Sequence, residues 1–405
     1  MPTTTINEID NTTSTEVSYT DYTVLIPAIF PTAVTSYTEK LFTKFSDFKS
    51  EIVDKITKTE TNVTSNIGYN MAYKLLELGM PVLYCKVIET TTSDEDGDTI
   101  ITTNLDNDFF TKFTDKGKYN IRFITSGGYV STAINGYMMD MAKTRGECIA
   151  LIDTQSTTVD TKEILNEIKN NVINSETNTY NESGNYATTF APWFKIEGED
   201  IIYPASFDYL ACFINSIKNG NPSYIAIANT ERGMSPLGNI TTLVEFGDLE
   251  TNILQARNVS YGSTFVAVNP ITNFDNYKNI IYGNRTLYPI GLTNSKQQVE
   301  TDLIASSFLN IRNLCCDIKK KLYTICRKYT FEPNSDTLWV NFKSEITSYL
   351  DKIKSNEGIS GYKIVKITDN KKATLKAKIN IIPIEGLEDF DITLTLEDSI
   401  EVNEQ

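Results

Sequence analysis

The strongest periodic pattern in the chain predicts an amphipathic helix near residues 311–328. Apolar side chains recur there at the three- and four-residue spacing of one helix face, at Ile311, Leu314, Cys315, Ile318, Leu322 and Ile325. The opposite face carries Arg312, Lys319, Lys320, Tyr323 and Arg327. A charged helix face is ordinarily a solvated face, and the alternative for this one is a surface that binds a partner.

A second helix and three strands are expected after this helix. Pro333 ends the first helix, and Asn334 or Ser335 can cap a second one whose apolar face runs from Leu338 to Ile353. Strand patterns follow at 362–368 and 373–382. The most regular alternation of apolar and polar residues comes last, and its apolar members are Phe390, Ile392, Leu394 and Leu396.

Upstream of these elements, strand patterns alternate with helical ones. Strands are expected at 82–88, 119–125 and 148–153, and helical patterns at 36–78, 129–142, 159–172 and 209–217. Shorter strand patterns lie at 188–196, 224–229, 264–268, 279–282 and 286–288. Strands separated by helices predict an α/β sheet with crossover connections.

These patterns predict an α/β domain at 26–288 and a smaller α+β C-terminal domain at 289–384, with strand-forming arms at 1–25 and 385–405. The N-terminal arm fits either an edge strand of the chain's own sheet or a strand donated to a neighbour. The C-terminal strand follows a break at Pro383 and Gly386, which suits donation. The strand-like residues of the N-terminal arm are Val17, Tyr19, Tyr22 and Val24.

Charge and composition narrow the class of protein. The formal net charge of -15 argues against a general nucleic-acid binder, which needs clustered lysine and arginine to neutralise phosphates. No apolar run has the length of a membrane span, and the polar N-terminus lacks a signal peptide's apolar core, so we expect a protein made and kept in a cytoplasm. Against this acidic background, residues 301–330 hold six lysines and arginines and two aspartates. That contrast favours a binding role for the basic helix face.

The residues give little support for catalysis, a cofactor or a metal. The chain contains no histidine, which excludes Ser-His-Asp triads, Cys-His pairs and HExxH zinc sites. The acidic loop at 90–98 misses the spacing of an EF-hand. Gly127 and Gly128 fit a tight turn better than a phosphate-binding loop, because no GxGxxG or P-loop pattern surrounds them. Glu231 and Arg232 are expected to form an ion pair that clamps a loop or joins two subunits.

The six cysteines are expected to be buried free thiols, because they show no paired metal-binding spacing and most lie in apolar patterns. Cys316 differs from the others. It lies toward the basic helix face, where neighbouring cations would favour its thiolate, so it is the candidate reactive thiol.

Several segments, taken in order, carry a family resemblance. Residues 308–339, followed by the strand pattern at 362–368 and the terminal alternating strand, resemble the C-terminal domain of contractile tail sheath proteins, whose relatives occur in contractile bacteriocins and type VI secretion machines. The resemblance continues upstream through residues 74–87, 122–128, 147–154, 191–195, 224–239 and 269–287. It spans about Tyr69 to Leu396, and the order of segments is more specific than any one of them. Within 232–239, Gly238 and Asn239 are shifted past the proline relative to the family's RG-x-x-x-PxN type of loop.

This resemblance implies a structural subunit, not an enzyme, that polymerises helically around a tail tube and contracts to drive the tube through a host envelope. The α/β domain would lie outside, the C-terminal domain inside, and both arms would add strands to neighbouring subunits. The basic face of Arg312, Lys319, Lys320, Tyr323 and Arg327 would face the tube. The implied partners are further copies of the chain, the tail tube protein, and baseplate and tail terminator proteins, in a virion tail assembled in the host cytoplasm without direct nucleic-acid contact or membrane insertion.

Two other classes of protein stay open. An α/β nucleotide-binding protein or enzyme would share the alternation of strands and helices and would use Gly127 and Gly128. A noncontractile surface or baseplate protein would polymerise differently or not at all.

Overall fold

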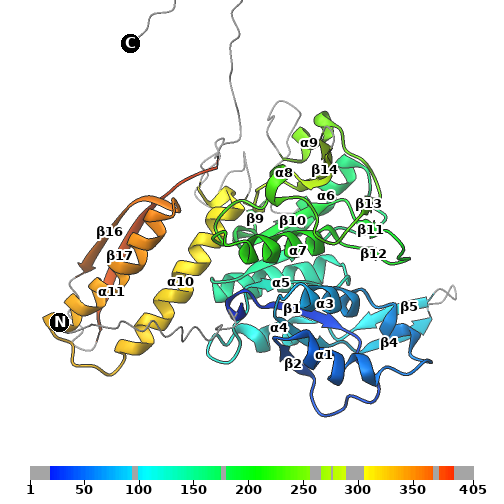
Figure 1. Cartoon of the computed structure of the whole chain (residues 1–405), viewed down its shortest axis with the longest axis horizontal. Helices are drawn as coiled ribbons and strands as arrows, with labels where there is room; N and C mark the ends of the chain where they lie inside the picture. The colour runs from blue at the N-terminus through cyan, green and yellow to red at the C-terminus, as the bar shows by residue number, and fades with distance from the viewer. Residues whose placement is uncertain are drawn as a thin grey trace, which may run out of the picture.

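An eight-stranded sheet organises the larger part of the molecule (Figure 1). The computed structural model describes residues 19–93, 99–174, 179–255, 266–274, 277–288, 305–367 and 374–386. The strand order of the sheet is β15-β14-β10-β7-β6-β1-β3-β2. Its strands are β1 (Val24–Ala28), β2 (Glu39–Phe42), β3 (Val82–Lys86), β6 (Phe123–Ile124), β7 (Ile149–Ile152), β10 (Ala187–Ala191), β14 (Asn269–Phe274) and β15 (Tyr277–Ile281).

The sheet is doubly wound. Neighbouring strands from β14 to β3 run parallel, and β15 and β2 are antiparallel at the two ends. From β1 the chain first adds β3 on one side, and then adds β6, β7, β10 and β14 in order on the other side. The winding direction therefore reverses between β1 and β6. The alternation of strands and helices correctly predicted this class of sheet.

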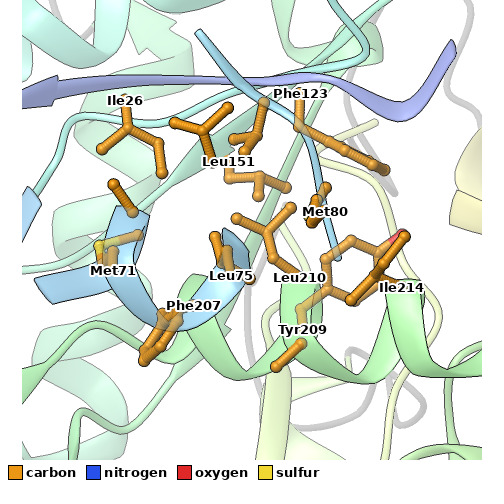
Figure 2. Close-up of a cluster of buried hydrophobic side chains, with 14 of the residues drawn as sticks. Ile26, Met71, Leu75, Met80, Phe123, Leu151, Phe207, Tyr209, Leu210 and Ile214 are labelled. Atoms are coloured by element: carbon orange, nitrogen blue, oxygen red, sulfur yellow. The ribbon is translucent and has the colours of Figure 1, made fainter. Parts of the chain in front are cut away.

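Helices cover both faces of the sheet, and each face has its own apolar core. The first core includes residues of α1 (Phe45–Glu51), α3 (Ile67–Glu77) and α7 (Ala205–Lys218). The second core includes residues of α4 (Asn107–Thr111), α5 (Thr132–Arg145), α6 (Thr161–Val172) and α9 (Asp248–Leu254). In Figure 2, Met71 and Leu75 of α3 and Leu210 of α7 point toward Ile26 and Phe123 of the sheet. The central strands are apolar on both sides because both faces are covered.

Several smaller sheets and helices lie around the large sheet. A three-stranded sheet has the order β12-β11-β13, and β4–β5 and β8–β9 are two-stranded hairpins. Short helices and several 3-10 turns, among them η1, also belong to this unit. These elements are η1 (Thr20–Tyr22), α2 (Thr61–Thr64), β4 (Glu89–Ser93), β5 (Thr99–Thr103), β8 (Ile173–Asn174), β9 (Thr179–Tyr180), β11 (Phe194–Ile196), β12 (Ile202–Tyr203), α8 (Asn229–Arg232) and β13 (Ile240–Thr242).

Two helices and a hairpin form a third core. The elements are α10 (Leu309–Tyr329), α11 (Asp336–Ser355), β16 (Ile359–Ile367) and β17 (Lys376–Pro383). The Ser335 side chain caps α11 by accepting a hydrogen bond of 3.2 Å from the Leu338 backbone N–H, as the sequence predicts. Figure 1 shows α11 and the hairpin on one side of α10 and the large sheet on its other side.

The N-terminal strand prediction is wrong at Val24. This residue begins β1 in the middle of the sheet, pairs with both β3 and β6, and has 0% exposed surface. It belongs to the chain's own core and is not a strand given to a neighbour. Tyr22 lies in the turn η1 with its ring edge against Phe213, and Tyr19 packs against the first core. The other five predicted arm residues lie outside the described residues: Val17, Phe390, Ile392, Leu394 and Leu396.

Other segments also differ from their sequence patterns, and residues 286–288, expected to be a strand, contain none. Strand β2 lies within the region expected to be helical, because its four residues, two charged followed by two apolar, show no alternating strand pattern. Residues 224–229 contain no strand; Ile225 and Ile227 pack on the first core from a turn. Strand β14 begins at Asn269, after the segment 264–268 where a strand was expected.

Candidate functional site

Helix α10 lies across the junction between the large sheet and the third core. Its first half is buried almost all round, from Leu309 to Ile318. Leu309 and Cys316 belong to the first core, whereas Leu314, Ile318 and Ile325 belong to the third. One helix therefore supplies side chains to both bodies and ties them together.

A buried polar cluster anchors this helix to the sheet. The Arg122 guanidinium, with 0% of its side chain exposed, lies 2.9 Å from Asp317 Oδ1. It also donates to Asn313, at 3.3 Å to the side-chain oxygen and 2.8 Å to the carbonyl. Burial alone would lower the pKa of Arg122, but the charge of Asp317 raises it, so the guanidinium stays ionised. Tyr209 accepts a hydrogen bond from Asn313, and the Ser223 hydroxyl donates to Asp317.

The predicted basic face of α10 is not a single exposed surface. Arg312 is 8% exposed and lies over the Tyr186 ring, with its guanidinium 4.5 Å from the ring centre. Lys320 donates to the Asp21 carbonyl at 2.8 Å and to Asn120 Oδ1 at 2.7 Å. Desolvation lowers the pKa of Lys320 to about 8. The expectation that these two side chains point outward is wrong, because the helix meets the large unit on its polar side as well, as far as Lys320.

The second half of α10 leaves part of the face open. Lys319 is exposed, with its ammonium 5.1 Å from the Tyr186 ring centre. Tyr323 and Arg327 are exposed, and the Arg327 guanidinium lies 5.7 Å from the Tyr323 ring centre. Of the predicted face, Tyr323 and Arg327 are the members that stand near each other and away from the sheet core.

Cys316 is not a reactive thiol. It is fully buried, and desolvation raises its pKa even though Arg122 and Arg312 lie near enough to lower it. None of the six cysteines forms a disulfide, and Cys326 is the exposed one. Burial of the helix in two cores, which the sequence pattern does not reveal, overrides the effect of the neighbouring cations.

The hairpin of β16 and β17 presents two different faces. Toward α11, it packs Tyr362, Ile364, Ala377, Ile379 and Ile381 against the third core. The other face is exposed and carries Lys363, Val365, Ile367, Lys376, Lys378, Asn380 and Ile382. Within the part of the chain that the structure describes, each of the two strands pairs with the other alone, so each has one open edge. An open strand edge offers free backbone donors and acceptors to a further strand.

The ligand-binding crevice of a doubly wound sheet is closed here by close packing. That crevice lies at the carboxyl ends of the strands where the winding reverses, which here are β1 and β6. A Cβ on either Gly127 or Gly68 would lie 2.1 Å from the Pro27 carbonyl oxygen, and one on Gly128 would lie 2.8 Å from Ile67. The glycine pair thus forms a tight turn against α3, as the sequence favours. The nucleotide-binding alternative loses its most specific support.

Two buried carboxyls lie near the same edge of the sheet. Asp153 follows β7 and accepts a hydrogen bond of 2.9 Å from Ser206, and Asp208 lies in the first turn of α7. Burial raises the pKa of each to about 7. A carboxyl of that pKa can act as a general acid or base, but both side chains are sealed from solvent at 1% and 0% exposure. Sequence reasoning missed both, although an aspartate directly after a buried strand was a visible signal.

The remaining sequence candidates are structural. Arg232 pairs with Glu231 at 2.7 Å and donates to the Ala226 carbonyl at 3.0 Å, which makes it a clamp within its own loop. Among the residues described, no cluster of carboxylates and thiols is arranged to hold a metal ion. Within the same ranges, no helix combines the length and apolarity needed to cross a membrane.

A cavity of about 630 Å³ lies between the large unit and the start of the hairpin. Tyr224, Asn229 and Arg232 line it from one side, and Gly358 and Ile384 from the other. The backbone N–H of Ile384 donates to the Gly358 carbonyl at 3.3 Å. The chain therefore continues past the end of β17 along this cavity.

Comparison with known proteins points to one architecture. Residues 305–397 match the family model of the phage tail sheath C-terminal domain. No curated protein matches the chain. A similar solved structure is the sheath complex of PVC, an extracellular contractile injection system, in its contracted state, with a TM-score of 0.65, 13% identity, and 98% of each chain covered.

Two structures of the anti-feeding prophage are also similar. Its baseplate in the contracted state has a TM-score of 0.65 and 15% identity, and its contracted helical sheath has 0.61 and 14%. Each match covers 98% of this chain and 99% of the other. The chain thus has the fold seen in these contractile sheath structures, and its residues 305–397 match the model of the phage tail sheath C-terminal domain.

Proposed function

We propose that this chain is the structural subunit of a contractile sheath. Copies of it would polymerise helically around a tail tube, and the sheath would contract to drive the tube through a host envelope. The observation that carries this proposal is the sheath C-terminal domain at residues 305–397, within a chain whose fold likeness to sheath subunits extends over 98% of its length.

The experiment is to purify the protein and image it by negative-stain electron microscopy. A sheath subunit should form long cylinders of regular helical repeat. Small discrete particles at all concentrations would overturn the proposal and favour an enzyme or a baseplate component. Partners expected in the particle are the tube, baseplate and tail terminator proteins, in a phage tail or a phage-derived device assembled in the host cytoplasm.

The two domains would occupy different layers of the sheath. The α/β unit, up to residue 288, would form the outer wall, and residues 289–384 would form the inner layer next to the tube. The proposed tube contact is reduced to Lys319, Tyr323 and Arg327, because Arg312 and Lys320 are occupied within the chain. The N-terminal arm is reduced to the residues before η1, since Val24 is in the sheet core.

The arms would link subunits by strand addition. The open edges of the hairpin support this, as does the alternating pattern of Phe390, Ile392, Leu394 and Leu396. Each added backbone hydrogen bond contributes about 0.5–1.5 kcal/mol net, so about five of them would contribute several kcal/mol per contact. Deleting residues 387–405 should leave a folded monomer that forms no cylinders. Cylinders of normal length from that truncation would refute the role of the arm.

Contraction would draw on energy stored at assembly. The extended lattice would be metastable, and the contracted lattice would bury more surface between rigid subunits, without nucleotide hydrolysis. The closed crevice at Gly127 and Gly128 supports this reading. Stoichiometric nucleotide consumption by the purified sheath during contraction would contradict it.

A further inference from the structure

The outward face of the β16–β17 hairpin is basic. Lys363 of β16 and Lys376 and Lys378 of β17 are exposed, and their neighbours at alternate positions, such as Ile364 and Ile379, face the third core. The register places Lys378 opposite Val365 and Lys363 opposite Asn380, so these side chains lie on one face of two adjacent strands. We name the two residues Lys363 and Lys378 the lysine row.

The lysine row differs from Lys366 of the same hairpin. Lys366 lies on the side of α11, where it pairs with Asp336 at 3.1 Å and stands over the Trp339 ring. By contrast, no ion pair within the described residues involves Lys363 or Lys378. Neighbouring like charges on one sheet face are unfavourable unless an acidic group lies between them. In a chain of net charge -15, this basic face is therefore suited to an acidic occupant.

The segment after Gly386 has the matching chemistry. Residues 387–405 contain seven acidic residues and no lysine or arginine. In its alternating stretch, Asp391 and Glu397 share one side with Thr393 and Thr395, and the apolar residues share the other. A strand of this pattern, added at an open hairpin edge with its apolar side toward α11, must place its acidic side on the face of the lysine row.

We propose that the lysine row recognises the acidic side of the C-terminal segment of a second copy of this chain, so that charge selects both the segment and the face it presents. This inference rests on the proposed sheath function and deepens it. A shift of one residue in the pairing register moves every side chain of a strand to the opposite face of the sheet. Here the burial of the apolar residues and the pairing of the charges favour the same register. The reversed register would expose the apolar residues and turn the acidic ones toward Ile379 and Ile381.

The path of the chain favours a second copy over the same one. After β17 the backbone continues along Gly358 and into the wall of the cavity shared with Tyr224 and Asn229. Ile384, Glu385 and Gly386 thus lead away from the hairpin toward the large unit. The open edges of the hairpin stay available for a segment that arrives from elsewhere.

A charge-swap experiment on the full-length chain tests the proposal. Variant K363E/K378E reverses the lysine row, and variant D391K/E397K reverses the segment. Each variant alone should raise the concentration needed for cylinder formation at low salt by about tenfold or more. A chain that carries all four substitutions should form cylinders at a concentration within about threefold of that of the unmodified protein. The readout is pelleting of cylinders with microscopy.

Controls separate this inference from folding and from net charge. Variant K58E/K162E makes the same change of charge on exposed lysines of the large unit and should assemble normally. Circular dichroism and urea unfolding should show that all variants fold. Normal assembly of either single reversal, or failure of the combined chain to regain assembly, would overturn the proposal. Absence of cylinders from the unmodified protein would instead defeat the proposed function.

Discussion

Arg122 and Asp317 form an ion pair with 2.9 Å between Nη1 and Oδ1, joining the strand region before β6 to the middle of helix α10. The two residues are far apart in sequence, and the Arg122 side chain is completely buried. A buried charge that loses its partner is strongly destabilising. This pair therefore fixes how the third core sits on the sheet.

The first prediction concerns this pair. Asp317→Asn should lower the free energy of unfolding by about 3 kcal/mol, because it leaves the Arg122 charge buried with neutral partners alone. Urea denaturation measures the change. The matched control is Lys143→Gln in the exposed pair of Lys143 and Glu182, which should change stability by about 0.5 kcal/mol or less. Equal effects of the two variants would contradict the anchoring role.

The second prediction is a dependence of stability on pH. Burial raises the pKa of Asp208 to about 7, well above the ordinary value of an aspartate. The folded state thus holds a proton that the unfolded state releases, and the stabilisation is complete below about pH 4 and lost as the pH rises through about 7. Asp208→Asn should therefore raise the free energy of unfolding at pH 8 by about 1–3 kcal/mol and change it little at pH 4.

Urea unfolding at several pH values measures this difference. Asp54→Asn, at an exposed position, should keep the pH profile of the unmodified chain. A gain at pH 8 that persists unchanged at pH 4 would show that the effect of Asp208→Asn does not come from ionisation.

The third prediction concerns the closed crevice. Gly127→Ala should destabilise the protein by about 3 kcal/mol or more, because the added Cβ would lie 2.1 Å from the Pro27 carbonyl oxygen and the backbone φ is 65°. Gly136→Ala in α5 is the control. A Cβ there meets nothing within 4 Å, and alanine in a helix should add about 0.5–1 kcal/mol. Thermal unfolding would distinguish the opposite signs.

The fourth prediction concerns Phe331, which follows α10. It has φ of 73° and is fully exposed, at a position where helices usually end in glycine or asparagine. Phe331→Asn should raise the free energy of unfolding by about 1 kcal/mol, because asparagine tolerates the left-handed conformation. Phe331→Ala removes the same exposed ring but keeps the strain, so it should give no gain. Equal gains from both variants would mean that the backbone is not the cause.

The fifth prediction compares an exposed and a half-buried basic residue of α10 in tube binding. Arg327→Glu should weaken co-sedimentation of sheath with tube at low salt and leave the free energy of unfolding within about 0.5 kcal/mol, since its side chain is exposed. Lys320→Glu should instead destabilise the fold by about 1–2 kcal/mol, because it breaks two hydrogen bonds of a half-buried side chain. Unchanged tube binding by Arg327→Glu would mean that this face is only solvated.

Hydrophobic periodicity predicted several helices and strands correctly. The strand at 82–88, the helices of the C-terminal region and the Ser335 cap are confirmed because local pattern and tertiary setting agree. Val24 shows the opposite case. A strand-like run near a chain end gives no information about which strands it pairs with, and β1 lies between β3 and β6.

The prediction of one exposed basic face on α10 failed for a different reason. A helical pattern predicts one buried apolar side, but α10 is packed on two sides as far as Lys320, so Arg312 and Lys320 contact the rest of the chain and not solvent alone. Arg122 and Asp317 could not be paired from sequence, because their contact depends on how the sheet and the helix dock. Lys378 of the lysine row, by contrast, was visible in the sequence, because it stands between the apolar residues Ala377 and Ile379.

Helix α10 also has a mechanical meaning. Its 21 residues make a rod roughly 30 Å long, held at its start by the large unit, where Leu309 belongs to the first core, and carrying residues of the third core toward its other end. Without a flexible joint inside the rod, a tilt of about 10° at the anchored end sweeps the far end through about 5 Å. A small rotation of the large unit would therefore displace the far end of α10, and the hairpin packed beyond it, by a distance comparable to the spacing between two β-strands.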